Sequence, residues 1–301
     1  MPLRRVFPAA VAAVGLLTGV AGAAADQTPK APSARAATHL TANSATSKAK
    51  AINPTLWNSF ITDEGTDGYA WNPTANGGSG FNPGGYSIAY FEPSNLVRRA
   101  NGSFTVTASP GTLQPGYKWT SGVLSSYGAF SITGGYISID AQMPTLNDGA
   151  LPGLFLLPGP GNPKNDEIDI FEGGMKLGTD NANHNFSGFV HYKSQATGDT
   201  VRVRASLSGV YHDYGLKWVP GKSLTWYLDG EQLIQVTSKQ FTIPSRAMEL
   251  IALLDIVSKQ AASWHTLPTI LQNYRMNVKS IVVAPLSGPA PWATTASTTA
   301  G

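Results

Sequence analysis

The feature that most constrains the fold is a succession of short strand-like runs separated by turn signals. From Ile52 to Ala284, runs rich in β-branched and aromatic residues alternate with turns rich in Gly, Pro and Asn. Asp229-Gly230, between two such runs, is the dipeptide of a two-residue hairpin. No segment shows a sustained helical period. The pattern predicts an all-β sandwich of two antiparallel sheets that pack face to face.

One of these runs is exceptionally acidic. Residues 166–172, Asp-Glu-Ile-Asp-Ile-Phe-Glu, carry four carboxylates in seven positions, whereas only 13% of the chain is charged. On a regular strand Glu167 and Asp169 share one face, but Phe171 joins them and Glu172 falls among the isoleucines. One extra residue near Ile170–Phe171, a β-bulge, returns Glu172 to the acidic face and Phe171 to the core. We therefore expect a bulged strand with three acids in one row.

The spacing of this row suits glycoside cleavage. With the bulge discounted, the Glu167 and Glu172 Cα atoms lie ~13 Å apart and their carboxyl groups about 5–6 Å apart. Retaining glycosidases place their two carboxyl groups ~5–5.5 Å apart, and inverting enzymes place them farther apart. Crowded like charges raise at least one pKa, so a carboxylate stands beside a carboxylic acid. A solvated acidic strand or a calcium site would show the same spacing, so spacing alone leaves these alternatives open.

Several motifs are similar to those of a known family. Gly149–Pro158, followed closely by Asp166–Glu172, resembles the signature of glycoside hydrolase family 16. Tyr211–Gly230 is similar to a second block of that family, and the resemblance extends over residues 56–284. The six-residue E-x-D-x-x-E form resembles the bulged branch, which includes laminarinases and agarases.

The resemblance implies a concanavalin-like β-jelly roll and a retaining, double-displacement mechanism. Glu167 would be the nucleophile, Glu172 the general acid/base, and Asp169 would tune the charge of the nucleophile. Many family members have tryptophans where this chain has Leu151 and Phe155. The substrate is therefore not carried over from laminarinases.

Four further residues are candidates for substrate binding. Aromatic rings stack on the apolar C–H side of a pyranose, which makes Trp119, Tyr192 and Trp264 candidates. His191 is the fourth candidate, because in the family pattern a histidine here lies near the acid/base. A packed, hydrogen-bonded histidine is the alternative for His191. The two tryptophans on alternating apolar strands, Trp218 and Trp226, are expected in the core.

The ends of the chain have a different composition from the middle. Residues 1–25 combine a basic start, an apolar run and small residues, the pattern of a secretory signal peptide. Residues 26–50 are mostly Ala, Ser, Thr and Lys and predict a disordered linker. Residues 51–285 form the predicted jelly-roll domain, and residues 286–301 a loose tail. We therefore expect a secreted, extracellular and monomeric protein.

Composition also excludes several functional classes. No basic patch with interleaved aromatics points to nucleic acid, and after the signal peptide no apolar run has membrane-spanning length. No cluster of histidines and acids has the linear spacing of a catalytic metal site. We expect no required cofactor; a structural Ca²⁺ on the outer face of the sandwich stays open, with no ligand set assigned.

These observations predict a secreted retaining endo-β-glycosidase that acts on a polysaccharide, either β-1,3-glucan or a related β-glucan or galactan. Two alternatives remain from sequence: a non-catalytic, lectin-like jelly roll, and a transglycosylase that uses the same three acids.

Overall fold

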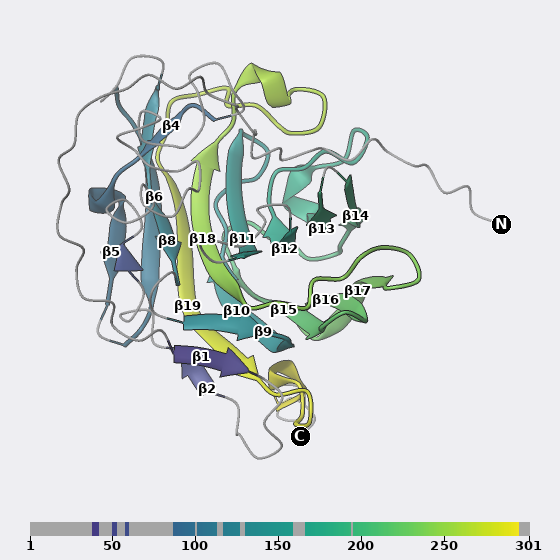
Figure 1. The fold of residues 1–301 in the computed structure, drawn as a ribbon. Helices are drawn as coiled ribbons and strands as arrows, with labels where there is room; N and C mark the ends of the chain where they lie inside the picture. Colours follow the sequence, from purple (N-terminus) through teal and green to yellow (C-terminus); the bar gives the residue numbers. More distant parts are fainter. Residues whose placement is uncertain are drawn as a thin grey trace, which may run out of the picture.

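A computed structural model describes residues 38–41, 50–52, 58–59, 87–99, 101–112, 117–126, 130–158, 166–193 and 195–294. Within these ranges the strands form two sheets, which Figure 1 shows as two layers. The predicted signal peptide lies outside the described residues. Among the described residues, the helices are too short or too polar to cross a bilayer.

The first sheet carries the acidic strand near its centre. Its strands, in spatial order, are β1 (Thr38–Thr41), β9 (Phe130–Thr133), β18 (Met248–Ile256), β11 (Ala150–Pro158), β12 (Asp166–Glu172), β13 (Asn185–Tyr192) and β14 (Gln195–Arg202). In the same sheet, β8 (Val123–Ser125) pairs with β18 and with β3 (Asn58–Ser59).

The second sheet packs behind the first. Its order is β17 (Glu231–Thr237), β16 (Ser223–Leu228), β15 (Tyr211–Val219), β10 (Gly135–Gln142), β19 (Tyr274–Ala284), β6 (Phe104–Pro110), β7 (Trp119–Ser121) and β4 (Ala89–Phe91). At its margins, β2 (Lys50–Ile52) pairs with β19 and β5 (Leu96–Arg98) with β6. The described pairs are antiparallel except β1–β9 and β4–β7. The short 3-10 helices are η3 (Pro93–Asn95), η4 (Ala182–His184), η5 (Lys259–Ala261) and η6 (Pro291–Thr294). The predicted all-β sandwich is confirmed.

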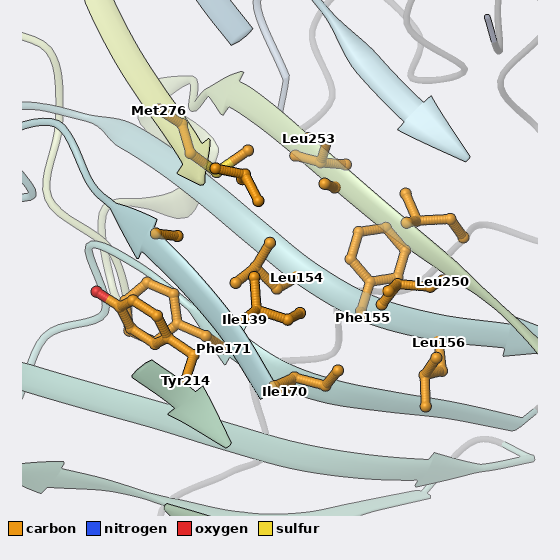
Figure 2. Packing of buried hydrophobic residues seen from close by; sticks show 14 of the residues in the cluster. Ile139, Leu154, Phe155, Leu156, Ile170, Phe171, Tyr214, Leu250, Leu253 and Met276 are labelled. Atoms are coloured by element: carbon orange, nitrogen blue, oxygen red, sulfur yellow. The ribbon is translucent and has the colours of Figure 1, made fainter. Parts of the chain in front are cut away.

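The core lies between the two sheets (Figure 2). The ring of Phe171 on β12 lies 4.6 Å from that of Tyr214 on β15, across the two layers. Ile139 of β10 and Leu154 of β11 are fully buried in the same cluster. Burial of each such side chain contributes about 1.5–3 kcal/mol, so alternation on facing strands favours the packing of the two layers.

The central strands β11 and β18 are buried on both faces. The continuous apolar run Leu151–Leu157 predicts this, because neither face of such a strand tolerates water. The Asp229-Gly230 hairpin between β16 and β17 is also confirmed, with both residues at positive φ.

The predicted linker contains a strand. Thr38–Thr41 forms β1, parallel to β9, and Lys50 begins β2. Strand pairing uses backbone groups and requires no apolar side chain, so a composition poor in hydrophobic residues does not exclude it. The remainder of the predicted linker lies outside the described residues.

The prediction of a loose tail is wrong for its described part. Trp292 of η6 is only 8% exposed, and its ring lies 4.7 Å from that of Tyr227 and 5.6 Å from that of Tyr136. Gly215 permits this contact, since a Cβ there would lie 2.9 Å from the indole. Trp292 is the single tryptophan of residues 286–301 and was the available signal of packing. The overall composition of this segment does not reveal it.

Asp148, in the loop between β10 and β11, fastens the segment that leads into β19. Its carboxylate accepts hydrogen bonds from Thr269 N (2.5 Å), Thr269 Oγ1 (2.6 Å), Gln272 Nε2 (2.9 Å) and the Tyr274 hydroxyl (2.8 Å). Burial alone would raise the pKa of Asp148, but these donors outweigh it and the pKa is lowered.

Replacement of Asp148 by Ala is expected to lower the free energy of unfolding by about 2–3 kcal/mol, because Thr269, Gln272 and the buried Tyr274 hydroxyl lose a charged acceptor. This stabilisation is present above the ordinary carboxyl pKa of 3.8 and is lost as the pH falls below it. Urea unfolding followed by circular dichroism measures the effect. The control is Asp180→Ala, which removes an exposed ion pair to Arg202 and should cost less than about 0.5 kcal/mol. Equal losses in the two variants would contradict the assignment.

Candidate active site

The acidic strand β12 is bulged where the sequence predicts it. Phe155 of β11 lies opposite Asp169, and the preceding residue Leu154 lies opposite Phe171. Ile170 is therefore the extra residue on β12. Because Phe171 points into the core, Glu172 returns to the face that carries Asp169.

His191 completes this face from the neighbouring strand. It lies opposite Glu167 on β13, and its Nε2 is 2.9 Å from Asp169 Oδ2. Ligand-type atoms of Glu167, Asp169 and His191 all lie within 4.8 Å of one another. The pairing of β12 with β13 thus brings His191 next to Asp169, which lies 22 residues earlier in the sequence. We call Glu167, Asp169, Glu172 and His191 the acidic row.

The acidic row is strongly desolvated, and this raises the pKa of each of its carboxyl groups. Desolvation raises the pKa of Asp169 to about 7 and that of Glu172 to about 8, the latter helped by the charge of Asp169. Desolvation and the neighbouring acids raise the pKa of Glu167 well above its usual range. The charge of His191 lowers the pKa of both glutamates and so offsets part of this increase. At neutral pH the row therefore holds protons as well as negative charge.

Beyond Glu172 the chain is held by a residue that the sequence analysis missed. His265 is fully buried, and its Nε2 lies 2.8 Å from the Gly173 carbonyl oxygen. Gly174, at φ +85°, passes so close that a Cβ there would lie 2.3 Å from the imidazole. Burial lowers the pKa of His265. The Gly-Gly pair directly after the acidic motif was the available signal, since it indicates a close approach by another part of the chain.

The segment with Trp264 lies beside the end of β12. The Lys176 amide donates to the Trp264 carbonyl at 2.8 Å, and Met175 forms an isolated bridge with His265. The Trp264 ring meets the His265 ring edge-on at 5.5 Å. Trp264 therefore lies beside Met175 and Lys176, which follow Glu172 in the chain. Sugar binding by Trp264 stays a prediction.

Two of the predicted substrate-binding residues lie elsewhere. Trp119 is 2% exposed within the hydrophobic core, and its Nε1 donates to the Gln272 carbonyl at 3.3 Å. Its faces are covered by protein, so the predicted stacking on a sugar is wrong for this residue. Tyr192 lies opposite Asp166, on the face of β13 away from His191. Strand alternation thus separates Tyr192 from the acidic row.

The acidic row also has the donors of a metal site. A histidine nitrogen and two carboxylates are a ligand set that Zn²⁺ accepts. The sequence showed no such spacing, because His191 reaches the row only through the pairing of β12 with β13.

Comparison with known proteins identifies the family. The model for "Glycosyl hydrolases family 16" matches residues 90–267, which include the whole acidic row. The chain belongs to glycosyl hydrolase family 16. Two relatives from Rhizobium meliloti (strain 1021), the endo-1,3-1,4-beta-glycanases ExsH and EglC, are each 33% identical, over 138 and 140 residues respectively. Each match covers 43% of this chain but only 28% of the relative, so the chain corresponds to a minor part of these proteins.

Solved structures of glucanases share the fold. The laminarinase catalytic domain of Thermotoga maritima MSB8 superposes with a TM-score of 0.58 at 22% identity, covering 77% of this chain and 92% of that one. The laminarinase of Thermotoga petrophila RKU-1 gives 0.59 at 21% identity, covering 78% and 93%. The β-glucanase of Bacillus licheniformis gives 0.55 at 18% identity, covering 68% and 88%. The predicted jelly roll of family 16 is confirmed.

Replacement of Glu172 by Gln is expected to stabilise the protein, increasingly so as the pH rises. The ordinary pKa of 4.5 rises to about 8 in the fold, so between these values the folded state retains a proton that the unfolded state has released. Stability contributed by that proton is lost as the pH rises through this window, and the variant lacks the loss. Melting temperatures at pH 5 and pH 8 should show the advantage of the variant growing by roughly 7–14 °C. Glu231→Gln, at an exposed position, is the control; parallel pH curves for Glu172→Gln and the parent would disprove the raised pKa.

Proposed function

We propose that the protein is a secreted retaining endo-β-glycosidase that hydrolyses a β-glucan with β-1,3 linkages. The single observation that carries the proposal is the bulge at Ile170, which puts Glu167, Asp169 and Glu172 on one face. Two glutamates on one face, one ionised and one protonated, are the groups that retaining hydrolysis uses. The names of the two R. meliloti relatives support a β-glucan substrate with internal cleavage.

In the first step the Glu167 carboxylate attacks the anomeric carbon while Glu172 donates its proton to the departing glycosidic oxygen. The products are a glycosyl ester on Glu167 and a free sugar chain end. Glu172, now a carboxylate, takes a proton from water, which attacks the anomeric carbon and releases Glu167. Two inversions retain the β configuration.

The surroundings suit these two roles. The raised pKa of Glu172, about 8, keeps its proton available at neutral pH. Burial and the neighbouring acids keep the pKa of Glu167 well above its usual range although His191 opposes them, so Glu167 must pass on its proton before it attacks. Asp169 lies between them, hydrogen-bonded to His191, and can share the proton that the nucleophile must lose.

The substrate surface differs from that expected of laminarinases. Phe155 lies directly across from Asp169 on the neighbouring strand, so it shares the acidic face. Its side chain is only 6% exposed and packs in the hydrophobic cluster, so this position does not offer a sugar the open aromatic face expected of a tryptophan there. We propose that Trp264, on the segment beside the end of β12, contacts the glucan.

Glu167→Gln and Glu172→Gln are each expected to lower kcat on the true substrate by about 10³-fold or more, without unfolding the protein. Reducing-sugar release from laminarin, mixed-linkage glucan and agarose identifies the substrate and measures the loss. A 2-deoxy-2-fluoro glycoside should label Glu167, as detected by mass spectrometry of the peptide. Asp166→Asn is the matched control, since Asp166 is one residue away on the opposite face, paired with Arg246. Near-parental activity in either glutamine variant would refute the proposed roles.

The same assay separates the alternatives. Binding of a glucan without release of reducing ends would indicate a lectin-like protein. Longer products in the presence of acceptor sugars would indicate transglycosylation.

We propose that hydrolysis requires no metal, because the two glutamates supply both the nucleophile and the proton. Zn²⁺ is expected to inhibit by binding Glu167, Asp169 and His191, and excess EDTA to restore the activity. Replacing His191 by Gln should weaken this inhibition, whereas His184→Gln, in η4, should not. Loss of activity in EDTA alone would contradict the proposal, and a fall in melting temperature there would reveal a structural calcium ion.

We further propose that residues 1–25 direct export and that the enzyme acts as an extracellular monomer on its polysaccharide. Expression with and without these residues, followed by assay of medium and cells, tests the export signal.

A further inference from the structure

Trp226 joins the second sheet to the acidic strand of the first. It lies on β16, is fully buried, and its indole Nε1 donates to the Asp169 carbonyl oxygen at 2.7 Å. The sequence analysis assigned Trp226 to the core, which is confirmed. Its polar atom, however, reaches across the core to the backbone of a residue in the acidic row.

The accepted carbonyl is at the point where β12 leaves its regular ladder. The pairing of β12 with β13 ends at Asp169, opposite Phe189. On the other side, the register with β11 shifts after Asp169 because Ile170 is the extra residue. The orientation of the peptide between Asp169 and Ile170 therefore determines the path of the bulged backbone. That path returns Glu172 to the acidic face.

Gly188 makes room for this contact. It lies on β13 beside Phe189, and a Cβ there would lie 2.5 Å from Trp226 Cδ1 and 2.6 Å from Nε1. Contacts this short do not occur between real atoms, so any side chain at Gly188 would displace the indole. A glycine and a tryptophan on different sheets are thus both needed for the hydrogen bond.

We propose that Trp226 is a positioning residue of the acidic row: its indole N–H fixes the Asp169–Ile170 peptide and thereby the placement of Glu172 relative to Glu167. This rests on the proposed roles of the two glutamates. Trp226 touches neither the substrate nor a reacting atom, so it acts only through the bulge. A misplacement of about 1 Å in a catalytic group can cost about 100-fold in rate.

A matched tryptophan separates positioning from simple packing. Trp218, on β15, is also fully buried, and its Nε1 donates to the Pro244 carbonyl at 2.9 Å, away from the acidic row. Trp226→Phe and Trp218→Phe each remove one buried indole hydrogen bond to a backbone carbonyl. Both should lose a comparable amount of melting temperature.

Only Trp226→Phe is expected to change catalysis: kcat on the glucan should fall roughly 10- to 100-fold with little change in KM. Its pH profile of kcat/KM should also shift, because the spacing of the coupled acids changes. Trp218→Phe should keep the parental kcat and pH profile.

If Trp226→Phe does not fold, site-specific incorporation of benzothienylalanine at position 226 replaces the N–H by sulfur with nearly the same shape. It should give the same fall in kcat with the core filled. Parental kcat and pH profile in either folded variant would overturn the inference. Glu167→Gln, assayed in parallel, distinguishes the failures: an active Glu167→Gln refutes the proposed function, whereas an inactive one alongside a normal Trp226 variant refutes only the positioning role.

Discussion

The site depends on one extra residue in strand β12. Without Ile170 in the bulge, strict alternation would put Phe171 beside the carboxylates and Glu172 among apolar side chains. Burial of an unpaired carboxylate costs several kcal/mol, and exposure of Phe171 would lose its contact with Tyr214 across the core. The bulge satisfies both residues at once. The hydrophobic core and the acidic row are thus two consequences of the same local irregularity.

The protein holds this row at a cost that the sandwich offsets. Three acids crowded in a desolvated position raise one another's pKa, and nothing in that arrangement favours folding by itself. The apolar strands β11 and β18, buried on both faces, and the packed second sheet supply the compensating stability. The desolvation that makes the row costly is also what keeps Glu172 protonated at neutral pH, so stability and chemistry are opposed at this site.

The row is supported by residues distant in sequence. Trp226 holds the carbonyl of Asp169 from the second sheet, and His265 contacts the carbonyl of Gly173 just beyond Glu172. Asp148 fastens the segment that follows His265. The bulged segment is therefore contacted near both of its ends by side chains from elsewhere in the fold. Such supporting contacts are what keep catalytic groups within the small tolerance that chemistry allows.

Local sequence was sufficient to determine the all-β class, the acidic strand and its bulge. Those features follow from alternation and from the conflict between Phe171 and Glu172, which involve only neighbours in the chain. The side chains that support the acidic strand were decided by tertiary structure: His265 and Trp226 reach it through loop and sheet packing, which no linear spacing encodes. The family resemblance placed His191 near the acid/base, but only strand pairing shows its hydrogen bond to Asp169. The dependence on tertiary packing also explains why the predictions for Trp119 and for the C-terminal tail were wrong. Trp119 and Trp292 lie in stretches of sequence that resemble those around exposed aromatic residues. The sheets that pack on them nevertheless bury both.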